Sequence, residues 1–248
     1  MLLTLYVDRA DINRLSRLER FPNELKLMII GKIPNARSIF NLALTGPQFC
    51  SLISVHEKKI AQDLIKFVIP AELLHVMVAT YAAIESDWNV HKGHTDLNSR
   101  EALSKPYVDS INQFVERYRC PEAFTLQAQH PNGVALYEAF QYLVMHGAIE
   151  TYALELASAA MKNIPKAPGF APEVSPPVLI RYEKALYVTQ LVAELFSWRG
   201  GDQTKEMYMA WGTFWYALSP WEIEQVFGVQ TLLMDSILGG KYKPEPGH

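Results

Sequence analysis

The sequence predicts an all-α fold, and three observations support this prediction. Apolar residues recur at helical spacing through most of the 248-residue chain, which is the signature of amphipathic helices. Proline and glycine interrupt that pattern at intervals that suit ordinary helices, for example at Pro34, Gly46-Pro47 and Pro70. Neither a hairpin signal nor an internal repeat emerges, which excludes propellers and leucine-rich arrays.

Three short helical patterns open the chain between Leu18 and Ile53. The first begins at Phe21-Pro22, because proline suits the start of a helix, and ends at Pro34. The second runs from Asn35 to the break at Gly46-Pro47, and the third follows that break. A module of roughly 40 residues is too small to close a core of its own. It must therefore pack on the rest of the chain or bury its spare apolar surface on another protein.

The first helix carries an apolar stripe that leaves both outcomes open. Leu25, Met28, Ile29 and Ile33 fall at helical spacing and lie on one face. The ordinary interpretation of such a stripe is burial in the core of a larger helical domain. The alternative is a surface that a partner protein covers.

Further helical patterns fill the rest of the chain. A polar stretch over 87–105 and a proline-rich stretch over 165–177 read as loops. The sharpest helix start is Ser219-Pro220, because Glu222 completes a capping box and Leu218 can pack on Ile223. We expect helices over 56–69, 71–86, 107–118, 134–161, 179–198, 204–218 and 219–238. The predicted domains are a helical module over 18–55, a helical domain over 56–238 and a frayed tail over 239–248.

Composition excludes several function classes. The net charge of −3, with no basic patch, argues against binding to nucleic acid or to an anionic membrane. The two cysteines, Cys50 and Cys120, are few and far apart, which is typical of a reducing compartment. No apolar stretch is long enough to cross a bilayer, and the start of the chain lacks the basic region of a secretory signal. We therefore expect a soluble intracellular protein, cytoplasmic or nuclear.

One polar loop is the best metal candidate in the sequence. His91 and His94 lie near Asp87 and Asp96, and imidazole and carboxylate are plausible zinc ligands. The spacing matches no established metal signature, and an ordinary surface loop explains the same residues. We expect no metal there.

Two other motifs lack residues that their chemistry requires. His56-Glu57 resembles the start of a zinc-protease helix, but Ile60 stands where the second histidine must be. Gly239-Gly240-Lys241 lacks both the upstream glycine and the following hydroxyl residue of a phosphate loop. No nucleophile motif is present either, so we predict that the protein is not an enzyme and needs no cofactor.

Aromatic residues are dense near the C-terminal end. Trp211, Trp215 and Trp221 are the members most useful for binding, because tryptophan is enriched at interfaces. Core packing is the ordinary interpretation of such a set, and a groove for a partner is the alternative. We interpret the three tryptophans as a possible target groove.

The first module resembles an F-box. That family opens with Leu-Pro-x-Glu-Leu/Ile, and this chain has Phe21-Pro22-x-Glu24-Leu25. The match continues through Ile29, Ile33, Ile39, Leu42, Leu44 and Phe49. Phe21 replaces the first leucine, and Gly46 to Cys50 stands where the family has a basic, tryptophan-containing end. The segments 181–187 and 214–226 look like parts of poorly characterised filamentous-fungal proteins, many of which begin with an F-box-like region.

The resemblance implies a partner and a role. An F-box binds a Skp-type adaptor, and the residues that would do so here are Phe21, Pro22, Leu25, Ile29, Ile33, Ile39 and Leu42. The helical domain would then bind a target protein, which makes the chain a non-catalytic substrate receptor of an SCF-type cullin-RING ubiquitin ligase. The alternative is a self-contained interaction module with a degenerate F-box and no part in ubiquitination. An exposed apolar face on the first helix favours the receptor, and burial of that face favours the alternative.

Overall fold

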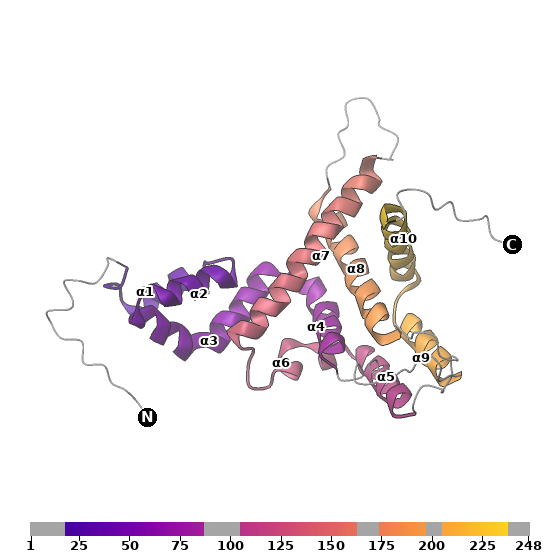
Figure 1. Ribbon diagram of the computed structural model, residues 1–248, viewed down its shortest axis with the longest axis horizontal. Coiled ribbons are helices and arrows are strands. Elements are labelled where there is room, and N and C mark those ends of the chain that lie inside the picture. Colours follow the sequence, from indigo (N-terminus) through magenta and orange to yellow (C-terminus); the bar gives the residue numbers. More distant parts are fainter. Residues whose placement is uncertain (1–17, 87–104, 163–173, 197–204, 238–248) are drawn as a thin grey trace. The chain divides into compact units, whose positions relative to one another are not determined.

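The computed structural model describes residues 18–86, 105–162, 174–196 and 205–237 (Figure 1). These residues form helices joined by turns and loops, and no strand occurs among them, which confirms the predicted all-α class. They divide into two compact units. The first unit holds described residues 18–69 and 132–144, and the second unit holds the other described residues.

Three helices form most of the first unit: α1 (Asn23–Ile30), α2 (Ala36–Leu44) and α3 (Pro47–Val68). Both α1 and α2 pack on α3 (Figure 1). The side chain of Asn35 caps α2, since its Oδ1 accepts a hydrogen bond from the Ser38 N–H at 2.7 Å. The predicted second helix is therefore present with the expected start.

A distant segment completes the first unit. The dipeptide Asn132-Gly133 is typical of a turn, and Gly133 has a φ of +85°, which favours glycine. A Cβ at this position would also lie 3.0 Å from Cδ of Lys58. Helix α7 (Leu136–Lys162) follows, and its Leu136 N–H donates to Glu57 Oε1 on α3 at 2.9 Å. This carboxylate satisfies an amide that a helix start leaves unpaired, and it ties α7 to α3 across 79 positions of sequence.

The domain boundary lies elsewhere than the sequence predicted. The predicted boundary between residues 55 and 56 falls inside α3, which continues without a break to Val68. The first compact unit accordingly ends at Ile69, and it also takes in 132–144. The first turn of α7 belongs with α3 because Glu57 caps it.

The second unit is built around α8 (Pro176–Phe196). Both α4 (Ala71–Glu85) and α10 (Pro220–Ile237) pack on α8, and α5 (Lys105–Tyr118) packs on α9 (Lys205–Tyr216). Two short helices, η3 (Pro121–Phe124) and α6 (Leu126–Gln129), contact each other and α4. The later part of α7, from Met145, belongs to this unit as well.

The core of the second unit is mostly apolar. Leu73 and Met77 on α4 and Leu191 on α8 are fully buried. The buried Thr80 hydroxyl donates to the Val76 carbonyl at 2.7 Å and lies 3.3 Å from the Tyr187 carbonyl on α8. An aromatic cluster joins α5, η3 and α9, with ring centroids 4.8 Å apart for Phe114 and Phe124 and 5.2 Å apart for Tyr118 and Phe214.

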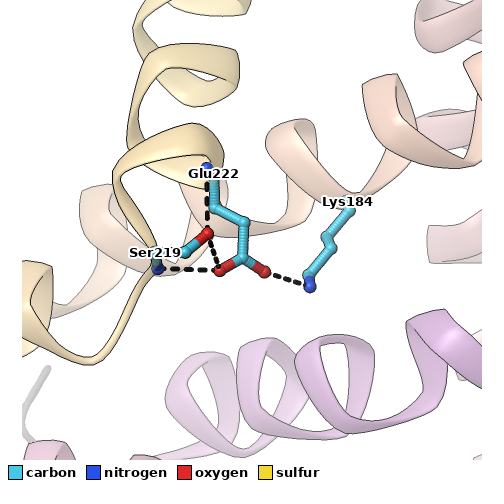
Figure 2. A network of polar contacts seen from close by, with 3 residues as sticks. All are labelled: Lys184, Ser219 and Glu222. Carbon is cyan, nitrogen blue, oxygen red and sulfur yellow. Dashed lines mark hydrogen bonds and ion pairs between the residues drawn. The ribbon is translucent and has the colours of Figure 1, made fainter.

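The capping box predicted at Ser219 is present at the start of α10 (Figure 2). The Ser219 N–H and hydroxyl both donate to Glu222 Oε2 at 2.8 Å, and the Glu222 N–H donates to the Ser219 hydroxyl at 3.3 Å. Glu222 also forms an ion pair with Lys184 on α8. Hydrogen bonds from Lys184 and Ser219 lower the pKa of the Glu222 carboxyl, although its partial burial opposes them. One carboxylate therefore both starts α10 and holds it against α8.

We expect Ser219→Ala to destabilise the protein by about 1 kcal/mol, because it removes the cap of α10. Ser219→Gly should destabilise the protein by only roughly a few tenths of a kcal/mol. Urea unfolding monitored by circular dichroism measures both. Ser236→Ala, in the exposed last turn of the same helix, is the matched control and should change little. Equal effects of the Ser219 and Ser236 alanine variants would contradict this account of the helix start.

Candidate protein-docking site

The orientation of α1 on α3 is set by two residues that the apolar pattern did not single out. Lys26 is almost fully buried; its Nζ donates to Gln48 Oε1 at 2.8 Å and lies 5.8 Å from the centre of the Phe49 ring. Ile30, one turn later on the same side, is also buried. Because these two side chains face inward, the predicted apolar stripe of α1 faces outward.

The outward stripe forms a surface that we call the docking face, made of Phe21, Pro22, Leu25, Met28 and Ile29. All five residues are exposed. Met28 is 66% exposed and Leu25 45%, values that core residues do not reach. Burial of the stripe, the ordinary interpretation of its spacing, is therefore wrong for these residues. Helix α2 adds two further exposed apolar side chains, Phe40 and Leu44.

The remaining predicted adaptor contacts are Ile33, Ile39 and Leu42, and they are less exposed than the docking face. Ile33 is past the end of α1, since that helix ends at Ile30 and Gly31 follows it as the cap. Pro34 disfavours helical geometry at Ile33, so an α-helix is not expected to continue through that residue. Ile33 and Leu42 are partly exposed, whereas Ile39 is only 1% exposed. Ile39 thus belongs to the core of the first unit and supports the face without being part of it.

A groove of about 390 Å³ opens beside the docking face, between α1 and α3. Its apolar lining includes Ile30, Ile39 and Leu64, all of them buried. Met28 from α1 and Phe67 from α3 also line it, and both side chains are largely exposed. Four polar side chains complete the lining: Glu24, His56, Lys59 and Asp63. An apolar groove with a few polar groups around it is suited to a side chain of a partner protein.

Sequence reasoning missed several residues of this site, among them Met28, Phe67 and Lys26. Met28 was in the stripe but not among the predicted partner contacts, and its helical spacing from Leu25 was the available signal. Phe67 reaches the groove from the last turn of α3, and Lys26 holds α1 in place. The pattern of neighbouring residues in the sequence predicts neither contact, because each contact depends on how two helices pack.

The three tryptophans of the predicted target groove lie on α9 and α10 of the second unit. Trp211 and Trp215 meet edge to face with centroids 5.5 Å apart, and Trp215 stacks on Phe227 of α10 at 5.3 Å. Trp221 is 61% exposed at the start of α10. The small pocket between α8 and α10 is lined by Lys184, Leu218, Glu222 and their neighbours, and by none of the tryptophans. The aromatic residues therefore form a surface rather than line that pocket.

The second unit also contains a buried cluster of polar side chains. Tyr187 on α8 lies with its hydroxyl 3.1 Å from His146 Nδ1 on α7. Glu183, one turn before Tyr187, is 3% exposed, and its Oε2 has no hydrogen-bond partner among the described residues. Burial, with a contribution from Glu150, raises the pKa of Glu183 from 4.5 to about 7, and burial lowers the pKa of His146.

His146, Glu183 and Tyr187 are each at most 3% exposed. Neither described pocket is lined by any of these residues. In the described ranges, no group of three histidine, cysteine, aspartate or glutamate side chains is placed to hold a metal ion. The candidate loop with His91, His94, Asp87 and Asp96 lies outside the described residues. Glu57, from the near-miss protease motif, has a structural role as the cap of α7.

Comparison of the chain with models of protein families, with curated proteins and with solved structures finds no match. Within the described part of the chain, no single helix is both long enough and apolar enough to cross a membrane. The docking face and its groove are the candidate site that the described residues form.

Glu183 makes the stability of the protein depend on pH. Its carboxyl keeps a proton in the folded state up to a pKa of about 7, against 4.5 for an ordinary glutamate. As pH rises through this window, the unfolded chain releases the proton first, so the free energy of unfolding falls and then levels off. We expect Glu183→Gln to be nearly neutral at about pH 5 and to stabilise by about 1–3 kcal/mol at about pH 8.

Urea unfolding of both proteins across this pH range measures the difference. Glu155→Gln, an exposed position on α7, is the control and should leave the pH profile unchanged. A Glu183→Gln profile parallel to the parent profile at every pH would contradict the assignment.

Proposed function

We propose that this protein is a non-catalytic substrate receptor of an SCF-type cullin-RING ubiquitin ligase. The first unit binds a Skp-type adaptor through the docking face, and the second unit binds a target protein. The reaction is then promoted by proximity, since binding raises the effective concentration of a target lysine near the ubiquitin-loaded enzyme.

The observation that carries this proposal is the exposure of the docking face. Phe21, Leu25, Met28 and Ile29 are each between 38% and 66% exposed and lie together at the start of the first unit. A contiguous apolar surface of this kind on a folded protein marks an interaction site, because its contact with water is unfavourable. Three of these four are positions at which the chain resembles an F-box, the family whose members bind such an adaptor.

Support for the face comes from within the same unit. Lys26 and Ile30 fix the rotation of α1, and buried Ile39 lies under the groove. The groove gives the face a concave part, where one apolar side chain of the adaptor would be fully desolvated. Well-packed, desolvated anchors of this kind usually supply most of the binding free energy at an interface.

We expect Leu25→Asp combined with Ile29→Asp to weaken binding to a purified Skp-type adaptor by at least about 30-fold, because buried charges would replace apolar contacts. Isothermal titration calorimetry on the full chain measures the affinity. Val55→Asp is the matched control: Val55 is an exposed apolar residue on α3 of the same unit and does not line the groove. It should bind as the parent protein does.

Two results would decide against the receptor. One is the absence of adaptor binding by the intact protein, which would favour the self-contained interaction module with a degenerate F-box. The other is unchanged binding by the double variant when its circular dichroism and urea midpoint match those of the parent protein.

A further inference from the structure

Helix α10 presents an outward surface that packing within the second unit does not use. Six of its exposed residues recur at helical spacing, and we call them the outer face of α10: Trp221, Glu224, Phe227, Gly228, Thr231 and Met234. Its opposite side holds the buried Val226 and Val229, and the helix packs on α8. From Trp221 to Met234 the outer face is roughly 20 Å long.

Three large apolar side chains on this face are in contact with water. Trp221 is 61% exposed, Phe227 51% and Met234 47%. Phe227 stacks on Trp215, and Trp215 contacts Trp211, so aromatic contacts link the outer face to two partly buried tryptophans of α9. Aromatic rings supply large contact areas at little cost in conformational entropy, which suits them to anchoring a partner.

Gly228 has no explanation within the chain itself. Glycine inside a helix lowers its stability relative to alanine, and the backbone here has no positive φ that would favour glycine. A Cβ built at Gly228 meets nothing within 4 Å. The missing side chain instead leaves a flat place in the middle of the outer face, where the backbone of a partner helix can approach closely.

Charge identifies the kind of partner. Helix α10 carries Glu222, Glu224 and Asp235 and no basic residue. The described residues of the second unit hold thirteen acidic and seven basic residues. Glu222 is paired with Lys184, but Glu224 is exposed on the outer face itself. A basic segment is therefore attracted to this surface, and nucleic acid is repelled from it.

We propose that the outer face of α10 binds an amphipathic helical segment of a target protein that carries arginine or lysine beside apolar residues. The assignment rests on the proposed function only in calling that protein a target. The apolar side of the segment packs against Trp221, Phe227 and Met234. Its basic side chains pair with Glu224 and lie over the aromatic rings.

The test uses the full chain and a fluorescein-labelled helical peptide of leucine, alanine and arginine with the arginines along one edge. A twin peptide has glutamate in place of each arginine. Fluorescence anisotropy should show that the arginine peptide binds at least about tenfold more tightly and loses affinity as salt is added. Glu224→Lys and Gly228→Leu should each weaken its binding by about tenfold.

Matched controls separate this surface from general effects. Glu155→Lys reverses an exposed charge on α7, and Gly147→Leu fills a helical glycine whose Cβ also meets nothing within 4 Å. Both should leave peptide binding unchanged. Equal binding of the two peptides, or no loss from either α10 variant, would overturn the proposal.

A failure of peptide binding to α10 can be distinguished from a failure of adaptor binding to the docking face. The Leu25→Asp, Ile29→Asp variant should bind the arginine peptide as the parent protein does, because its changes lie in the first unit. Peptide binding without any adaptor binding would support the outer face of α10 while contradicting the ubiquitin-ligase proposal.

Discussion

The rotation of α1 about its own axis is the constraint on which the candidate site depends. Lys26 is buried against Gln48 and Phe49 of α3, and Ile30 is buried on the same side. Burying an ammonium group is costly unless it is paired, so the hydrogen bond to Gln48 and the contact with the Phe49 ring are needed. With these contacts made, Leu25, Met28 and Ile29 must face water. A turn of α1 by one residue would bury the stripe and remove the docking face.

A segment from later in the chain, residues 132–144, helps to stabilise the small first unit. The three helices resembling an F-box do not supply a complete core, and residues 132–144 join them. Glu57 caps α7 at Leu136, and the Gly133 turn fits against Lys58. The first unit therefore closes its core with a later part of its own chain, and its docking face remains open. The surface that completes the core is thus different from the docking face of the same unit.

Local chemistry made part of the fold predictable. The Ser219 capping box and the turn at Asn132-Gly133 follow from neighbouring residues, and both are present. Most of the longer helices lie close to their predicted ranges, whereas η3 and α6 were not predicted. The joining of residues 132–144 to the first unit was not predictable, because it depends on the contact of Glu57 with a residue 79 positions away.

Of the candidate site, only the apolar stripe of α1 was predictable from the sequence. Helical spacing placed Leu25 and Ile29 on one face, but spacing does not say whether that face is covered. The answer depends on Lys26, a residue that pattern reasoning assigns to the surface. The same limit applies to Ile39, which the family resemblance grouped with the contact residues and which the packing of α2 on α3 buries.

The two units differ in charge, and this difference constrains what each can bind. The described residues of the first unit hold seven basic and five acidic residues, whereas the second unit has an acidic excess. A single partner surface of one sign is therefore attracted to one unit and repelled by the other. Separate partners would resolve this conflict, and the proposed adaptor on the docking face and the proposed basic segment on α10 would be such a pair. This argument holds whatever the placement of the two units, because it depends only on the charges that each one carries.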